Sequence, residues 1–164
     1  MKAELQESKP SYVYVTYIRT TPEKLWEALT NGDFSEKYWF GYRMETEWKV
    51  GADFRLRAPD GNLDKNWVGK VLEYNPFKRL AYNTFLCTDK TSTANKRNGP
   101  TKVTYELEAM GPLVRLRLIH ENLIPDDFES DLNTWKGINN GWPAVMSGLK
   151  SLLETGQAIV FPSK

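Results

Sequence analysis

The chain has 164 residues, of which 22 are basic and 21 acidic, so it is close to neutral at pH 7. No block of like charge is long enough for a nucleic-acid or membrane face, and the length favours one domain, 1–164, with an ordered core of about residues 12–158. Cys87 is the only cysteine, the first ten residues lack the apolar centre of a secretion signal, and no apolar run could span a bilayer, which predicts a cytoplasmic protein without membrane insertion.

The first predicted elements are a strand and two short helices. Residues 12–19 are rich in aromatic and β-branched side chains, which is typical of a strand. Thr21-Pro22 is a helix start, with the threonine as the cap, and Asn31-Gly32 is a stop signal. We expect a second short helix directly afterwards, capped by Asp33 or Ser35.

Short strands dominate the middle of the chain. We expect them at residues 44–48, 52–58, 67–74 and 80–87. Phe54 and Leu56 alternate with charged side chains, which indicates a strand with one face in water. Residues 88–100 are polar and contain Gly-Pro, so they are expected to form a mobile loop.

The next segment predicts a hairpin with a defined register. Residues 103–109 and 114–120 each alternate apolar and polar side chains around Gly111-Pro112. A turn there places Ala109 opposite Val114, Glu108 opposite Arg115 and Glu106 opposite Arg117. The opposite charges of the last two pairs support this register. The inner face then receives Tyr105, Leu107, Leu116, Leu118 and His120.

The end of the chain predicts a long amphipathic helix. Apolar residues recur at helical spacing at Leu132, Trp135, Ile138, Trp142, Val145, Met146, Leu149, Leu152 and Leu153. The helix is expected over about residues 129–154, with a distortion near Pro143 and an end at Gly156. The alternative is a helix that begins near Gly141, with Pro143 in its first turn. A long helix after many strands predicts a helix lying across a curved sheet.

Several motifs in this order resemble one protein family. They are Thr21–Thr30 (TPEKLWEALT), Gly69–Glu73 (GKVLE) with the following Lys78-Arg79-Leu80, Val103–Leu107 (VTYEL), Leu118–Leu123 (LIHENL), and Gly141-Trp142-Pro143 with Leu149–Gly156. Together they resemble the activator of heat-shock-protein-90 ATPase homologue family, which belongs to the START-like, helix-grip superfamily. The resemblance covers roughly residues 12 to 158.

The resemblance implies an α+β helix-grip fold. In it, a curved antiparallel sheet of about seven strands grips a long C-terminal helix, and two short helices follow the first strand. Eukaryotic co-chaperones of the family carry an additional N-terminal domain, for which this sequence shows no counterpart. Relatives in the superfamily bind lipids, steroids, polyketides or other hydrophobic molecules, and a minority are enzymes.

The residues themselves argue against catalysis and against a metal or cofactor. His120 is the only histidine, so a site with two histidine ligands cannot form, and no nucleophile motif or phosphate-binding glycine loop is present. The acidic cluster before the last helix fits capping better than calcium binding; its members are Asp126, Asp127, Glu129 and Asp131. We therefore expect no catalytic residue, no metal and no cofactor.

The aromatic residues point to a pocket under the last helix. The expected lining is Phe54, Tyr105, His120, Trp135 and Trp142. Trp39 and Phe40 follow the short helices and are expected to form a lid over one end. The alternative is a core that these side chains fill completely, which leaves no room for a ligand.

Three functions follow in order of preference. The first is a non-catalytic protein that binds a small hydrophobic molecule under the helix. The alternative is an interaction module that assists a chaperone. The third is a cyclase-like or hydrolase-like enzyme, for which His120 alone offers acid–base chemistry near pH 7.

Overall fold

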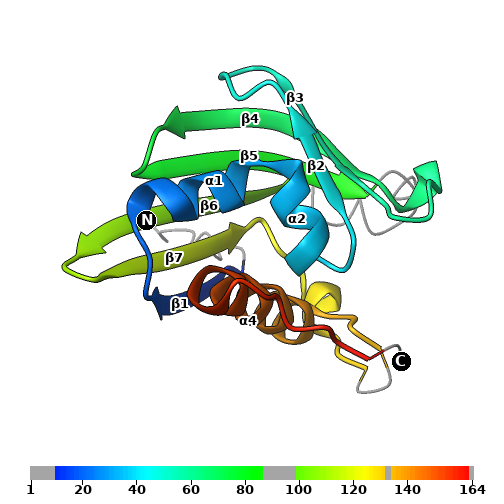
Figure 1. Ribbon diagram of the computed structural model, residues 1–164. Coiled ribbons are helices and arrows are strands. Elements are labelled where there is room, and N and C mark those ends of the chain that lie inside the picture. The colour runs from blue at the N-terminus through cyan, green and yellow to red at the C-terminus, as the bar shows by residue number, and fades with distance from the viewer. Residues whose placement is uncertain (1–9, 87–98, 132–133, 163–164) are drawn as a thin grey trace, which may run out of the picture.

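A computed structural model describes residues 10–86, 99–131 and 134–162. Seven strands form one antiparallel sheet in the order β1-β7-β6-β5-β4-β3-β2 (Figure 1). The strands are β1 (Tyr12–Ile18), β2 (Arg43–Thr46), β3 (Asp53–Arg57), β4 (Trp67–Asn75), β5 (Arg79–Leu86), β6 (Thr101–Met110) and β7 (Leu113–Glu121). The helices are α1 (Pro22–Thr30), α2 (Gly32–Tyr38) and α4 (Ile138–Thr155), with short 3-10 turns η1 (Leu63–Lys65) and η2 (Pro125–Phe128). This is the α+β helix-grip architecture that the sequence predicts.

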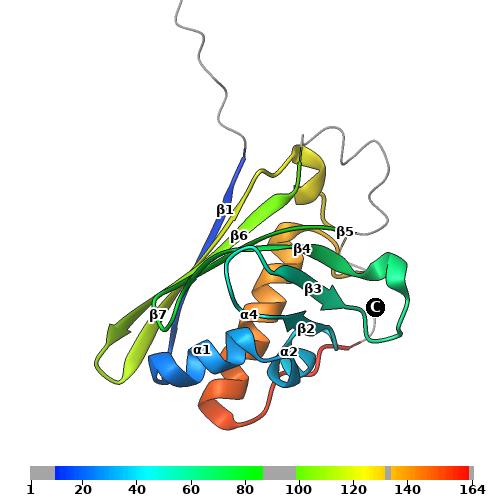
Figure 2. The ribbon, with the colours of Figure 1, turned by 90° about the horizontal axis from the view of Figure 1, so that it is seen from above.

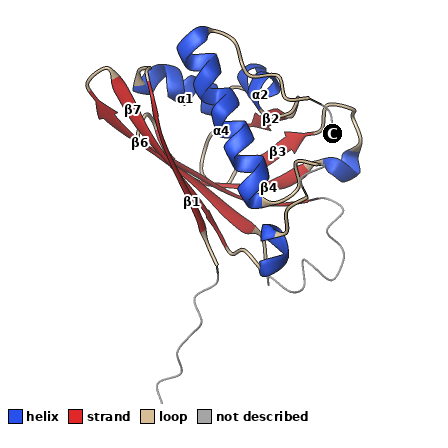
Figure 3. Ribbon diagram, turned by 90° about the horizontal axis from the view of Figure 1, so that it is seen from below, coloured by secondary structure: helices blue, strands red, loops and turns tan. Residues whose placement is uncertain are grey.

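The helices lie on the concave side of the sheet. Figure 2 shows the strands curving around α4, with α1 and α2 near its C-terminal half, and Figure 3 shows α4 crossing the same face from the other side. The buried apolar residues of the inner sheet face and of the three helices form one core cluster. The space between α4 and the sheet is therefore the place where a pocket can open.

The helix pair α1–α2 follows the sequence signals with one correction. The Thr21 hydroxyl accepts a hydrogen bond from the Lys24 backbone N–H at 3.2 Å, as expected for the cap of α1. The cap of α2 is Asn31, whose side-chain oxygen accepts from the Asp33 N–H at 2.9 Å, so the prediction of Asp33 or Ser35 as the cap is wrong. The Ser35 hydroxyl instead accepts from the Met44 N–H at 2.9 Å and ties α2 to β2.

The β6–β7 hairpin has the predicted register. Ala109 lies opposite Val114, Glu108 opposite Arg115, and Glu106 opposite Arg117. The side chains of Arg117 and Glu106 approach to 3.5 Å on the outer face. Leu116 and Leu118 on the inner face are fully buried. Alternation and charge pairing were therefore sufficient to place this hairpin.

The β4–β5 pair contains a close approach that only glycine permits. A Cβ atom at Gly69 would lie 1.9 Å from the Asn83 carbonyl oxygen. The Asn83 side-chain oxygen accepts from the Lys70 N–H at 2.8 Å, and the register shifts between Val71 and Glu73. A bulge of this kind bends a strand and adds to the curvature of the sheet. The predicted loop 88–100 lies largely outside the described residues.

Helix α4 begins later than the favoured prediction of about residue 129. It starts at Ile138, after Gly137, which has φ of 99°. A Cβ at Gly137 would also lie 2.7 Å from the Glu129 carbonyl oxygen, so glycine is needed on both counts. The alternative prediction, a start near Gly141, is closer to the observed start at Ile138. It places Pro143 in the first turn of the helix, whereas Pro143 lies in the second turn. Gly156, with φ of 83°, ends the helix as predicted.

Candidate functional site

A pocket of about 630 Å³ lies between the N-terminal half of α4 and the inner face of the sheet. Its walls come from β3 to β7, from the end of α2, from the segment before α4 and from α4 itself. The lining residues are mostly aromatic or aliphatic; those used below are Trp39, Phe40, Phe54, Trp67, Tyr82, Thr84, Phe85, Thr101, Val103, His120, Leu123, Trp135, Trp142 and Val145. Phe40, Trp67 and Phe85 are the most exposed large apolar side chains among them, so at these three residues the lining of the pocket meets solvent.

The wall on the α4 side is fixed by one hydrogen bond. The Trp142 indole Nε1–H donates to His120 Nδ1 at 3.0 Å, and the two rings meet edge to face with centroids 5.8 Å apart. Both side chains are buried, with exposed fractions of 8% and 9%. Because Nδ1 accepts this bond, the neutral imidazole carries its proton on Nε2. The bond holds both rings in place as rigid parts of the wall.

The sheet side of the pocket is a stack of aromatic rings. Phe54 on β3 and Tyr82 on β5 are parallel, with centroids 4.0 Å apart. The Tyr82 hydroxyl shares a hydrogen bond of 3.2 Å with the hydroxyl of Tyr105. Burial raises the pKa of Tyr82, and it raises the pKa of Tyr105 well above the ordinary value of 10. Both hydroxyls are therefore neutral at physiological pH, and this wall carries no charge.

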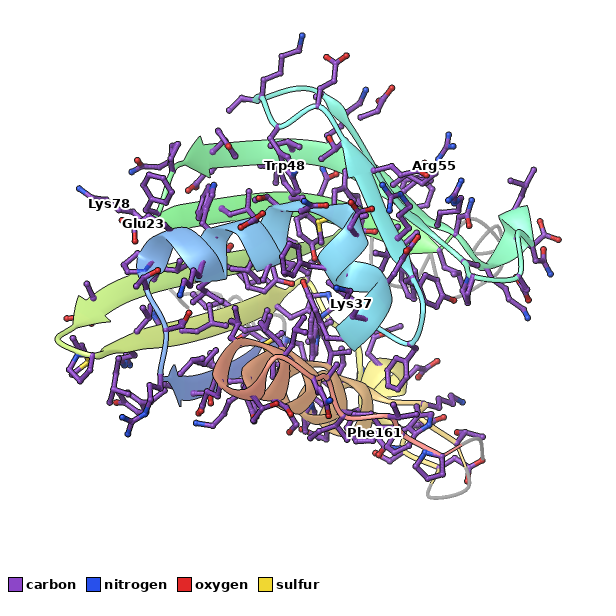
Figure 4. The ribbon with its side chains drawn as sticks, in the orientation of Figure 1. Glu23, Lys37, Trp48, Arg55, Lys78 and Phe161 are labelled. Atoms are coloured by element: carbon purple, nitrogen blue, oxygen red, sulfur yellow. The ribbon has the colours of Figure 1, made fainter. Side chains whose placement is uncertain are left out.

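The end of the pocket near the α2–β2 connection is a second aromatic cluster. Trp39 contacts Trp142 with ring centroids 5.3 Å apart, and Phe40 contacts Trp135 at 5.7 Å. Phe161, from the segment that follows α4, packs edge to face on Trp135 at 5.0 Å and contacts Phe40 at 6.1 Å. Figure 4 shows Phe161 on this returning segment, beside α4. Residues far apart in the chain therefore close this end together.

Polar groups are few and lie on the floor and at the rim. Thr84 and Thr101 face each other across β5 and β6, and the Thr101 hydroxyl donates to the Thr84 carbonyl oxygen at 3.1 Å. Asp126, Asp127, Glu129 and Lys136 also line the pocket, and the Lys136 ammonium lies 4.0 Å from a Glu129 carboxylate oxygen. A mostly apolar pocket with a few polar groups is typical of sites for small molecules.

Most of the predicted site residues meet at this pocket. Phe54, His120, Trp135 and Trp142 line it, and so do Trp39 and Phe40, which were expected to be a lid. Tyr105 does not line it. Its side chain is fully buried behind Tyr82 in the core, so it faces the predicted side of the sheet but lies too deep.

Several lining residues were not selected from the sequence. Thr84, Thr101 and Val103 share the inner face with Tyr82 and Tyr105 at every second position of their strands, so strand parity could have identified them. Leu123 follows the end of β7, where no periodic pattern marks it.

Within residues 10–86, 99–131 and 134–162, no cluster of three or more His, Cys, Asp or Glu could hold a metal ion. No helix in this part of the chain is long and apolar enough to cross a bilayer.

Comparison with known proteins identifies the family. The profile of the Activator of Hsp90 ATPase homolog 1-like protein family matches residues 19–154. The chain belongs to this family. The match covers strands β2 to β7, helices α1 and α2, all but the last residue of α4, and every pocket residue named above, whereas β1 precedes it. A search of curated protein sequences finds no match.

Solved structures of similar proteins support the fold. The solution structure of the Aha1 dimer from Colwellia psychrerythraea is 21% identical, with a TM-score of 0.69 over 91% of this chain and 99% of that one. A crystal structure of a Mesorhizobium loti protein is 26% identical, with a TM-score of 0.69 over 88% and 96% of the two chains. An HSP90 activator from Plasmodium falciparum is 20% identical, with a TM-score of 0.58 over 80% and 86%. These likenesses concern the arrangement of strands and helices.

Proposed function

We propose that this protein is a non-catalytic binding protein for a small hydrophobic molecule, held between α4 and the inner face of the sheet. The observation that carries the proposal is the aromatic pocket of about 630 Å³. This volume falls within the range of about 300–1,000 Å³ that is usual for ligand sites. The competing interpretation, a core filled by its own side chains, does not account for a space of that size.

The chemistry of the walls favours a neutral and largely flat ligand. Phe54 and Tyr82 line the sheet side as a stacked pair of rings, and the bond to His120 holds the Trp142 ring in place. Aromatic walls of this kind give a large contact area to aromatic or alicyclic molecules. A carboxylate buried between these apolar walls would lose its hydration, so neutral ligands are favoured.

Binding can be tested with a neutral fluorescent probe, N-phenyl-1-naphthylamine, after the purified protein has been stripped of bound molecules. The pocket-filling variant Val103→Trp places an indole on the floor, since Val103 lines the pocket on β6. Val15→Trp is its matched control, because it is the same substitution at an exposed position on the outer face of β1. We expect Val103→Trp to lose binding and Val15→Trp to keep it. Equal binding by both, with both folded by circular dichroism, would exclude the pocket as the site.

A second candidate is assistance to a chaperone through the surface. The outer face of the edge strand β1 exposes three apolar side chains; these are Val13, Val15 and Tyr17, at 47%, 38% and 46%. Exposed apolar patches often mark contacts with partner proteins. The related Plasmodium falciparum protein is an HSP90 activator. If this chain acts in the same way, it should raise the ATPase rate of an Hsp90, and Val15→Asp should abolish the effect while leaving probe binding intact.

A further inference from the structure

The aromatic end wall of the pocket rests on irregular segments of the chain. Phe40 lies between α2 and β2, with φ of 48°, and is followed by Gly41, with φ of 80°. Trp135 lies in the segment between η2 and α4, just before Gly137. Most of the remaining lining residues lie on strands or on α4, apart from Leu123 and the residues of η2. Connecting segments open at lower free energy than the interiors of helices and strands, so this wall is the part of the pocket best suited to move.

Phe161 braces this wall from behind. Its ring contacts both Trp135 and Phe40, yet Phe161 itself does not line the pocket. It belongs to the segment that follows α4 and turns back beside the helix after Gly156 (Figure 4). The two wall rings therefore lie between the pocket and the Phe161 ring.

The segment that carries Phe161 is weakly attached. Its last hydrogen bonds are at Gln157, whose carbonyl oxygen accepts from the Ser151 hydroxyl at 2.7 Å and from the Thr155 hydroxyl at 3.1 Å. Among the described residues, none of 158–162 makes a further hydrogen bond. Val160 is 91% exposed. Beyond the partly buried Ala158, the ring of Phe161 is thus the main contact that holds this segment against the molecule.

We infer that Phe161 is a latch on the pocket: its ring holds Phe40 and Trp135 in the closed position, and a ligand enters and leaves when the segment 158–162 lifts away. This inference rests on the proposed function, because it describes access to the same pocket. The position of the wall agrees with it, since Phe40 both lines the pocket and is partly exposed, so this wall separates the pocket from solvent.

A latch affects rates more than affinity. Removing the Phe161 ring lowers the barrier to opening, which acts on entry and exit alike, whereas the surfaces that touch the ligand are unchanged. We expect Phe161→Ala to raise both the association and the dissociation rate of N-phenyl-1-naphthylamine by roughly tenfold, which corresponds to about 1.4 kcal/mol of barrier. The dissociation constant should change less than about threefold, a shift of under roughly 0.7 kcal/mol.

The test is stopped-flow fluorescence on the full chain, with Val160→Ala as the matched control on the same segment. Val160→Ala should leave both rates at the wild-type value, because its side chain is in water. Equal rates for Phe161→Ala and the wild type would overturn the latch and leave the binding function standing. A loss of affinity with unchanged association would also overturn it, because Phe161 would then be part of the binding surface.

Hydrogen–deuterium exchange gives a second measurement that does not need a ligand. If Phe161 braces the wall, the amides of residues 40–42 and 134–137 should exchange faster in Phe161→Ala than in Val160→Ala. Unchanged exchange there would overturn the latch even if no probe binds. Failure of the wild type to bind any neutral probe, together with faster exchange, would count against the proposed function alone.

Discussion

The burial of Trp142 and its hydrogen bond to His120 allow the stability of Trp142 variants to be predicted. Trp142 is 8% exposed and donates its indole N–H to His120 Nδ1 at 3.0 Å. A buried tryptophan removes about 200 Å² from water, which at about 25 cal/mol per Å² amounts to roughly 5 kcal/mol. Since alanine retains the Cβ, we expect Trp142→Ala to lower the free energy of unfolding by about 3–5 kcal/mol.

The milder change Trp142→Phe separates the hydrogen bond from the packing. Phenylalanine keeps most of the ring contact with Trp39 but removes the donor, so Nδ1 of His120 loses the partner that the indole supplies. We expect a loss of about 1–3 kcal/mol. A double-mutant cycle with His120→Leu should give a coupling energy of about 1 kcal/mol.

The assay is urea unfolding at 25 °C followed by far-UV circular dichroism, because the chain has six tryptophans and its fluorescence would mix several sites. The four proteins of the cycle should share one m-value, so that the midpoints report stability alone. A coupling below about 0.3 kcal/mol would refute the reasoning, since the two residues would then contribute independently.

Three further predictions use the same unfolding assay. Gly69→Ala should cost more than about 4 kcal/mol, because its Cβ would overlap a carbonyl oxygen 1.9 Å away on β5. Gly137→Ala should cost about 2–4 kcal/mol, since φ of 99° is strained for alanine and the Cβ meets a carbonyl at 2.7 Å. Burial raises the pKa of Tyr38, Tyr82 and Tyr105 above 10, so the unfolded chain loses these protons first. Stability is therefore complete below pH 10 and falls above it, by up to about 1.4 kcal/mol per pH unit for each tyrosine.

Further variants check the last two results. Gly156→Ala has a positive φ of 83° but open space around the new Cβ, so it should cost less than Gly137→Ala. Tyr82→Phe should reduce the alkaline loss of stability, because it removes one of the three buried hydroxyls. An unchanged alkaline loss in Tyr82→Phe would contradict burial as the cause.

The sheet could be predicted from the sequence because its signals are local. Alternation fixes which face each side chain takes, and the charge pair Glu106–Arg117 fixes the register of the hairpin. The start of α4 could not, because Trp135 and Ile138 continue the helical spacing across Gly137. A Cβ at Gly137 would overlap the carbonyl oxygen of Glu129 at 2.7 Å, and this close approach leaves no mark on the helical spacing.

The sequence predicts which side chains face the inside of the sheet, but not which of these line the pocket. Strand parity and the helical stripe place Phe54, His120 and Trp142 on inward positions, where they are found. The same parity places Tyr105 inward, but it lies one inner-face position beyond Val103 on β6, where it is fully buried, and parity alone does not show how far along the strand the pocket extends. The contact between Phe161 and Trp135 could not be predicted from the sequence, because it forms only when the segment after α4 folds back on the molecule.

The pairing of β1 with β7 has a consequence for how the protein is made. Tyr12 pairs with His120 and Ile18 with Val114, so β1 is synthesised about a hundred residues before the strand that pairs with it. Contacts between such distant segments slow folding. Until β7 has been made, Val13, Val15 and Tyr17 belong to an unpaired strand, which is prone to aggregate. The newly synthesised chain is therefore most vulnerable at β1, until β7 is in place.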